Sequence, residues 1–222
     1  MVVLFDLDDT LVDHHTAFRA ATRTLYDSLA SSVPFDKFAA TWAASQRRQY
    51  DRYLAGELSY DGQRLARVRD TVDPTLSDDE ADRLFGTYLA AYEAAWTLFP
   101  DVLDCLHQLS DCRLGVITNG QEHQQRLKLA RTGIAGHFAC VVTSEAFGAP
   151  KPHPDIFRHA CALLKADPEQ TLFVGDSYDV DAVAARRAGL HGVWLDRAGV
   201  AGVTHSPPVI RSLRELAALV RR

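Results

Sequence analysis

The chain has 222 residues, of which 47% are hydrophobic and 24% charged, the composition of an ordinary globular protein with room for one large domain or a core plus an insert. Its formal net charge of −5 gives no positive field that would draw nucleic acid. No apolar run reaches membrane length and no basic segment precedes an apolar one at the N-terminus, so the sequence predicts a cytoplasmic protein with no membrane partner.

The cysteines and histidines show no metal-binding spacing. The four cysteines stand singly among apolar residues, and the nine histidines form no H-x-x-x-H or H-E-x-x-H motif. We therefore expect reduced, buried thiols and no zinc site.

The first element in the chain is a short β-branched and aromatic run, Val2 to Phe5, that is too short for a helix and predicts a buried strand. It ends at Asp6 and Asp8, followed by Asp9 and Thr10. Two acids this close repel each other unless one is protonated or a cation lies between them, which hints at a metal. The stretch alone is equally compatible with a turn that caps a helix. The residues at the other strand ends are needed to choose between a metal site and such a turn.

Residues 14–97 have helical periodicity and predict a satellite helical bundle. Aromatic residues such as Phe38 and Trp42 recur at steps of three and four. Asp36 is expected to cap one helix, and the capping box from Ser77 to Glu80 to open the last.

From Pro100 onward helices and strands alternate. The predicted helices are 101–110, 121–132, 154–164, 180–188 and a closing helix 212–220; the predicted strands are 113–117, 139–143, 171–175 and 191–195. With the first strand this makes five, and strands separated by helices predict an α/β fold with a doubly wound parallel sheet. The expected organisation is a core of residues 1–13 and 98–222, with 14–97 inserted.

Three later segments place polar groups at strand ends. Thr118, Asn119 and Gly120 precede a helix N-terminus, where a hydroxyl and backbone N–H groups can face an anion, although such a tripeptide also makes a good turn. Lys151 lies between two prolines that bias it to an extended conformation; alone, it reads as an exposed loop lysine. Asp176 leaves a strand and Asp181 lies on the following helix, while helix capping accounts for Asp179.

The conjunction of these groups in one chain is specific, and it resembles the haloacid dehalogenase superfamily of aspartate-nucleophile hydrolases, in the branch with a helical cap. The matching stretches are Phe5-Asp6-Leu7-Asp8-Asp9-Thr10-Leu11, Ile117-Thr118-Asn119-Gly120, Lys151-Pro152-His153-Pro154-Asp155-Ile156-Phe157 and Gly175-Asp176-Ser177 with Asp181. The insert matches in position and helical character only.

The resemblance implies a Rossmann-like core and a Mg²⁺-dependent phosphatase that hydrolyses monoesters of small metabolites through an aspartyl-phosphate. Asp6 would be the nucleophile, and Asp8 the acid that protonates the leaving oxygen and then the base that deprotonates water. The implied Mg²⁺ ligands are Asp6, the backbone carbonyl of Asp8 and Asp176, with Asp181 acting through water or by holding the other ligands. The implied phosphate-binding groups are Thr118, the backbone of Asn119 and Gly120, and Lys151.

Three other functions are compatible with parts of this pattern. Sugar phosphomutases usually carry Gly-Val where this chain has Asp9-Thr10. Haloacid dehalogenases attack carbon and need neither Asp8 nor a metal-binding Asp176. In a phospho-accepting signalling domain the phosphoryl group must last, whereas Asp8 would hasten its loss. The sequence therefore favours a phosphatase.

The insert is expected to close over the nucleophile and admit only a small leaving group, such as a sugar phosphate or nucleoside monophosphate. Residues 60–64, Tyr-Asp-Gly-Gln-Arg, combine a flexible glycine with hydrogen-bonding side chains, which suits a substrate-facing turn. Gln63 and Arg64 are accordingly predicted to read the substrate.

Overall fold

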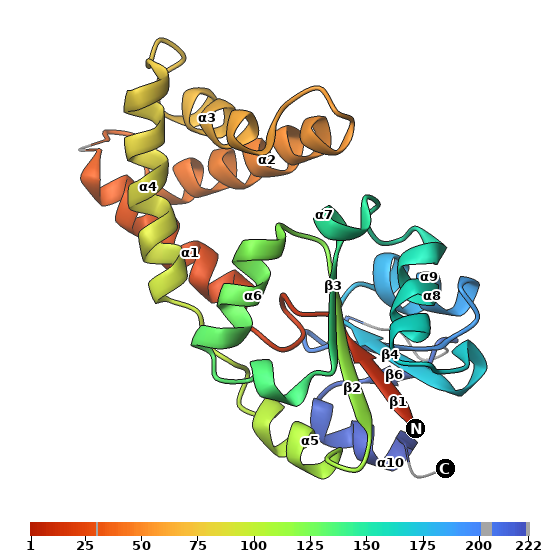
Figure 1. The fold of residues 1–222 in the computed structure, drawn as a ribbon. Coiled ribbons are helices and arrows are strands. Elements are labelled where there is room, and N and C mark those ends of the chain that lie inside the picture. The colour runs from red at the N-terminus through yellow and green to blue at the C-terminus, as the bar shows by residue number, and fades with distance from the viewer. Residues whose placement is uncertain (30, 201–205, 221–222) are drawn as a thin grey trace. The chain divides into compact units, whose positions relative to one another are not determined.

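The computed structural model describes residues 1–29, 31–200 and 206–220, drawn in Figure 1. The chain divides into two compact units, one of residues Met1–Asp13 with Thr97–Arg222 and the other of His14–Trp96. Each unit is described by itself below.

The first unit is built on a parallel sheet whose described strands have the order β3-β2-β1-β4-β5-β6. The strands are β1 Val2–Phe5, β2 Arg113–Thr118, β3 Cys140–Thr143, β4 Thr171–Gly175, β5 His191–Leu195 and β6 Val209–Ile210. Its main helices are α5 Val102–Gln108, α6 Glu122–Arg131, α7 Ser144–Phe147, α8 Pro154–Leu163, α9 Ala184–Arg187 and α10 Leu216–Val220, with short helical turns η1 Ala135–His137, η2 Pro168–Gln170, η3 Tyr178–Val183 and η4 Leu213–Glu215. The predicted doubly wound α/β fold is confirmed: α8 and α9 cover one face of the sheet, and α5, α6 and α10 lie on the other (Figure 1).

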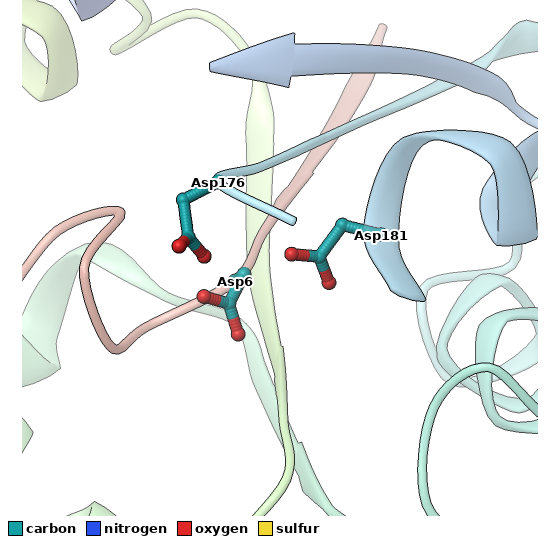
Figure 2. A group of neighbouring side chains, drawn as sticks. All are labelled: Asp6, Asp176 and Asp181. Carbon is teal, nitrogen blue, oxygen red and sulfur yellow. The ribbon is translucent and has the colours of Figure 1, made fainter. Parts of the chain in front are cut away.

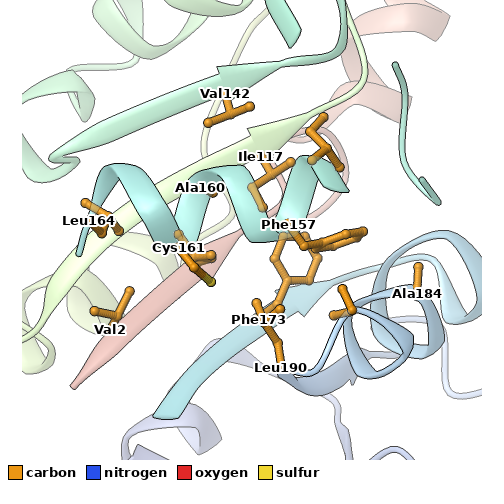
Figure 3. Packing of buried hydrophobic residues seen from close by; sticks show 14 residues of the cluster. Val2, Ile117, Val142, Phe157, Ala160, Cys161, Leu164, Phe173, Ala184 and Leu190 are labelled. Carbon is orange, nitrogen blue, oxygen red and sulfur yellow. The ribbon is translucent and has the colours of Figure 1, made fainter. Parts of the chain in front are cut away.

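The core lies between the sheet and its helices. All four residues of β1 are buried because helices cover both faces of this central strand, which explains why the strand reads as an unbroken apolar run. On the α8 side, Phe157 packs edge-on against Phe173 of β4 with ring centroids 5.0 Å apart (Figure 3). This packing fixes the strands whose carboxyl ends carry the polar groups.

The structure differs from the predicted elements at three places in this unit. The strand β6 was not expected because two residues after a Ser-Pro-Pro segment carry no readable periodicity. The four-residue helix α7 is too short to show one. The helix expected over 180–188 begins earlier, and its first part, η3, is a π-helix in which the amide of Ala182 donates to the carbonyl of Ser177 at 3.3 Å. Ser177 rather than Asp179 caps it.

The second unit consists of the helices α1 His14–Ser28, α2 Phe35–Leu54, α3 Tyr60–Thr71 and α4 Asp78–Ala94. Trp42 of α2 is fully buried in its aromatic core, and the capping box of Ser77 and Glu80 is present. Asp36 does not cap α2, because Pro34 takes the cap position and Asp36 lies in the first turn. In the described part of the chain, no helix combines the length and the apolar character that crossing a membrane requires.

The chain leaves the first unit and re-enters it through two segments that run side by side. The amide of Asp13 donates to the carbonyl of Thr97 at 2.9 Å, and that of Phe99 to the carbonyl of Leu11 at 3.1 Å. Val12 and Leu98 form an antiparallel bridge between them. Both crossing segments therefore belong to one hydrogen-bonded pair of the first unit.

Candidate active site

The parallel register of the sheet gathers the predicted site residues at one edge. Phe5 pairs with Val116 on one side and with Val174 on the other, so the residues that follow these three strands emerge together. The amide of Asp6 still donates to the carbonyl of Val174 at 2.9 Å. Carboxyl ends of parallel strands are where open α/β sheets bind ligands, and this edge is the candidate active site.

Asp6 is buried, and two side chains hold its carboxylate. Lys151 Nζ lies 2.6 Å from Oδ1, and Thr10 Oγ1 donates to Oδ2 at 3.1 Å. The Thr10 hydroxyl also accepts the amide of Asp176 at 3.1 Å. Thr10 thus ties the loop after β1 to the loop after β4.

Asp6, Asp176 and Asp181 form an acidic cluster in which one carboxylate oxygen from each lies within 4.8 Å of the others (Figure 2). Asp181 Oδ1 accepts Lys151 Nζ at 2.6 Å and its Oδ2 accepts the Ser177 amide at 3.0 Å. Across residues 1–29, 31–200 and 206–220, no hydrogen-bond donor reaches the carboxylate of Asp176. A Cβ on Gly175 would clash with the Asp181 carboxyl group, so a glycine is required there for the cluster to form.

Burial and mutual repulsion shift the pKa values in this cluster. Burial, with the charges of Asp181 and Asp8, raises the pKa of Asp6 to about 7 although Lys151 opposes the shift. Burial and the charges of Asp6, Asp181 and Asp9 raise the pKa of Asp176 to about 8. The pKa of Lys151 is raised in spite of burial, because the two carboxylates that it contacts favour its charged form.

The donor set fits a hard divalent cation. Three carboxylates face one ammonium group, and closely spaced carboxylate oxygens are what such cations prefer. Lys151 does not offset the combined effect of burial and mutual repulsion, which together raise the pKa values of Asp6 and Asp176. The cluster can therefore bind a metal ion at the carboxyl edge of the sheet.

The predicted phosphate-binding residues lie at this same edge, but two of them are engaged within the protein. The Asn119 side chain pairs with the main chain of Lys151, donating to its carbonyl at 2.9 Å and accepting its amide at 2.8 Å. The Gly120 amide donates to Ser144 Oγ at 3.0 Å. Lys151 is buried rather than an exposed loop lysine, and Asn119 fixes its position.

Asp8 has two partners that the sequence analysis missed. Lys128 Nζ lies 2.5 Å from Asp8 Oδ1, and Gln125 Nε2 donates to Asp8 Oδ2 at 3.0 Å. Both partners are buried on α6. The sequence offered one signal for such a partner. Lys128 lies next to Leu129 in the predicted helix 121–132, and a lysine that is buried beside apolar residues almost never lacks a partner.

Asp9 has a φ of 58°, in the left-handed region that disfavours most side chains. Glycine, asparagine and aspartate tolerate this conformation best. The turn after Asp8 therefore accepts an aspartate where glycine or asparagine would also fit.

Gln63 and Arg64 belong to the helical unit and do not form a turn. Ser59 Oγ accepts the Gly62 amide at 2.9 Å and so starts α3 at Tyr60, which makes the expectation of a flexible turn wrong. Gln63 is only 7% exposed, and Arg64 lies over the Tyr60 ring, 4.2 Å from its centroid.

Comparison with known proteins identifies the family. The model of the haloacid dehalogenase-like hydrolases matches residues 1–189. Glyceraldehyde 3-phosphate phosphatase from Methanopyrus kandleri is 32% identical over 201 residues, which cover 88% of this chain and 83% of that protein. Phosphoglycolate phosphatase from Salmonella typhi is 32% identical over 205 residues, covering 87% and 80%.

Solved structures share the fold over the full chain. The HAD hydrolase YfnB from Bacillus subtilis, bound to magnesium, superposes with a TM-score of 0.80 at 24% identity and covers 100% of this chain and 98% of that one. The 2-haloacid dehalogenase from Pseudomonas syringae pv. Tomato has a TM-score of 0.75 at 28% identity, with coverage of 99% and 97%. The chain therefore belongs to the haloacid dehalogenase-like hydrolase family and is an enzyme of the hydrolase class.

Proposed function

We propose that the protein is a Mg²⁺-dependent phosphatase that hydrolyses phosphate monoesters of small metabolites through an aspartyl-phosphate. The observation that carries the proposal is the convergence of Asp6 with Lys151, Asp176 and Asp181, since it joins a nucleophile to a cation site at one strand edge. The glyceraldehyde 3-phosphate and phosphoglycolate phosphatases among the relatives support a small phosphorylated substrate.

Asp6 is the proposed nucleophile. Its carboxylate attacks phosphorus, and the bond to the leaving oxygen breaks as the aspartyl-phosphate forms. Asp8 gives a proton to that oxygen and later takes one from the water that cleaves the intermediate, work typically worth about 10²- to 10⁴-fold. Lys151 holds Asp6 in place and offers its positive charge to the phosphoryl oxygens.

The metal site of this proposal consists of the carboxylates of Asp6 and Asp176 and the backbone carbonyl of Asp8. When bound, Mg²⁺ supplies positive charge that offsets the charge of the transferring phosphoryl group. Asp181 is assigned the supporting role, in which its two oxygens hold Lys151 and the Ser177 amide in place. Asp176 fits the direct role, since its carboxylate has no donor among the described residues.

Thr118 and Lys151 are the proposed phosphate-binding side chains, together with the backbone at Asn119 and Gly120, whose amide would have to exchange its hydrogen bond to Ser144 Oγ for one to the phosphoryl group. Thr118 Oγ1 accepts a hydrogen bond from Gln125 Nε2 at 2.7 Å, which leaves its own hydrogen to donate to a phosphoryl oxygen. The selection of sugar phosphates or nucleoside monophosphates, the role of Gln63 and Arg64 in it, and the cap role of the helical unit stay predictions.

Haloacid dehalogenation is the second candidate, because a dehalogenase is among the similar structures. That chemistry needs neither an acid at Asp8 nor a cation at Asp176. Release of chloride from 2-chloropropionate, without phosphate release from any ester, would decide for the dehalogenase.

Metal removal tests the proposal directly. With EDTA the hydrolysis of para-nitrophenyl phosphate should fall to background, and added Mg²⁺ should restore it. Asp176→Asn should abolish the restored activity, whereas Asp179→Asn in the neighbouring η3, whose side chain is exposed, should retain it. Full activity in EDTA would contradict the metal assignment.

The two acids next to β1 should behave differently when replaced. We expect Asp6→Asn to be inactive and never phosphorylated, while Asp8→Asn is phosphorylated by para-nitrophenyl phosphate and then hydrolyses the intermediate slowly. Mass spectrometry of acid-quenched protein measures the phosphorylated fraction. Equal turnover in Asp8→Asn and the parent protein would exclude Asp8 as the acid and base.

A further inference from the structure

Helix α6 carries two polar side chains that are more deeply buried than helix-surface residues normally are. Gln125 is 2% exposed and Lys128 is 1% exposed. They are three residues apart and so lie on one face of the helix. A charged lysine in such a position is stable only when it is paired, and Asp8 is one such partner here.

The two side chains hold Asp8 at both of its oxygens. Lys128 Nζ contacts Oδ1 at 2.5 Å and Gln125 Nε2 contacts Oδ2 at 3.0 Å. Contacts at two points fix the plane of the carboxylate, whereas one contact would let it turn. The Asp8 side chain is 27% exposed, so a reacting group can still reach it.

Gln125 also connects Asp8 to Thr118. Its Nε2 donates both to Asp8 Oδ2 and, at 2.7 Å, to Thr118 Oγ1. In its ionised form the Asp8 carboxylate can only accept, so the amide nitrogen faces Asp8 in that form, which sets how the amide is turned. A Cβ on Gly120 would come within 2.7 Å of the same nitrogen, so the glycine leaves the space that the Gln125 amide fills.

We propose that Lys128 and Gln125 are positioning residues that hold the Asp8 carboxylate in its proton-transferring orientation. The proposal rests on the proposed function. In the first step the proton of Asp8 goes to the leaving oxygen as its bond to phosphorus breaks and the bond from Asp6 forms. In the second step a water proton returns to Asp8 as the water oxygen bonds to phosphorus and the bond to Asp6 breaks.

Steady-state kinetics with para-nitrophenyl phosphate separate positioning from a general structural effect. Nitrophenolate leaves without needing a proton, so kcat/KM, which reports only the first step, should stay within about threefold in Lys128→Met and Gln125→Leu. Hydrolysis of the aspartyl-phosphate needs Asp8 as base, so kcat should fall about 10- to 100-fold and KM should fall with it. Gln124→Leu, the same substitution one position earlier, should change neither constant.

A double-mutant cycle then shows whether the two residues act through Asp8. In an Asp8→Asn background, Lys128→Met and Gln125→Leu should lower kcat by less than about twofold, because the group that they position is gone. Losses that add to that of Asp8→Asn would overturn the proposal, as would a fall of kcat/KM in parallel with kcat in the single variants.

Two further readouts keep the test decisive. If Lys128→Met fails to fold by circular dichroism, Gln125→Leu carries the test, because it leaves the Lys128–Asp8 pair intact. If the parent protein hydrolyses no ester in Mg²⁺, the proposed function fails, and crystal structures of the variants still test the positioning: Asp8 should leave its orientation in both. An unmoved Asp8 carboxylate would overturn the proposal.

Discussion

Asp6 and Asp176 make the metal-free site sensitive to pH. Their pKa values of about 7 and about 8 lie far above the value near 4 of an unfolded aspartate. Between those values the folded chain holds protons that the unfolded chain has lost. The stability that this provides is complete below about pH 4, decreases steadily above that pH, and is lost once pH has risen through about 7 to 8.

We therefore expect the melting temperature of EDTA-treated protein to fall between about pH 4 and about pH 8 and to level off above, and Mg²⁺ to reduce that fall. Binding of Mg²⁺ displaces these protons, so its affinity should rise with pH. Thermal unfolding and calorimetric titration measure both effects, and Asp176→Asn should flatten the pH dependence. A melting temperature that is independent of pH in EDTA would contradict the assigned shifts.

Local sequence predicts the place of some residues of the site but not the partners of others. Asp6 and Asp176 follow apolar strands directly and Asp8 comes two residues after Asp6, so the sequence predicts their place at the sheet edge. Gln125 and Lys128 meet Asp8 across more than a hundred residues, and their own helix pattern gives no partner. Asn119 binds the main chain of Lys151, which lies 32 residues further along the chain. A contact between residues so far apart leaves no local signal, so residues 118–120 predicted only an anion-binding site or a turn.

At the scale of elements, η3 completes the acidic cluster because it carries Asp181. The π-helix η3 has only 6 residues, too few to show a periodicity different from that of an α-helix, so the sequence predicts a helix but not its first, wider turn. Strand β5 permits this turn because it has a glycine there: a Cβ on Gly192 would clash with the carbonyl of Ala182 in η3. Wide turns of this kind are frequent at functional sites.

Gly192→Ala should accordingly destabilise the protein by about 2–4 kcal/mol, since the clash is with backbone and cannot be relieved by a side chain. The matched control is Gly136→Ala in η1, where a Cβ meets nothing within 4 Å and the expected change is within about 0.5 kcal/mol. Urea unfolding measures both variants. Equal stability of the two would show that η3 moves away from β5 without cost.

At the scale of the whole molecule, the site carboxylates Asp6, Asp176 and Asp181 all belong to the sheet-containing unit. That unit is made of two separate stretches of chain, so its folding requires the ends of the helical insertion to meet. They do so in the hydrogen-bonded pair of Asp13 with Thr97 and of Leu11 with Phe99.

This pairing makes the helical unit a cassette that protein engineering can remove or exchange. Because the crossing segments are antiparallel at Val12 and Leu98, a turn of about two to four residues should join Asp13 directly to Thr97 and replace His14–Trp96. The shortened chain is expected to fold and to bind Mg²⁺ by calorimetry with the pH dependence of the parent. A chain that stays unfolded would show that the sheet depends on its insertion. If it folds, Asp13 and Thr97 mark an acceptor site at which foreign helical units can be grafted without redesigning the catalytic edge.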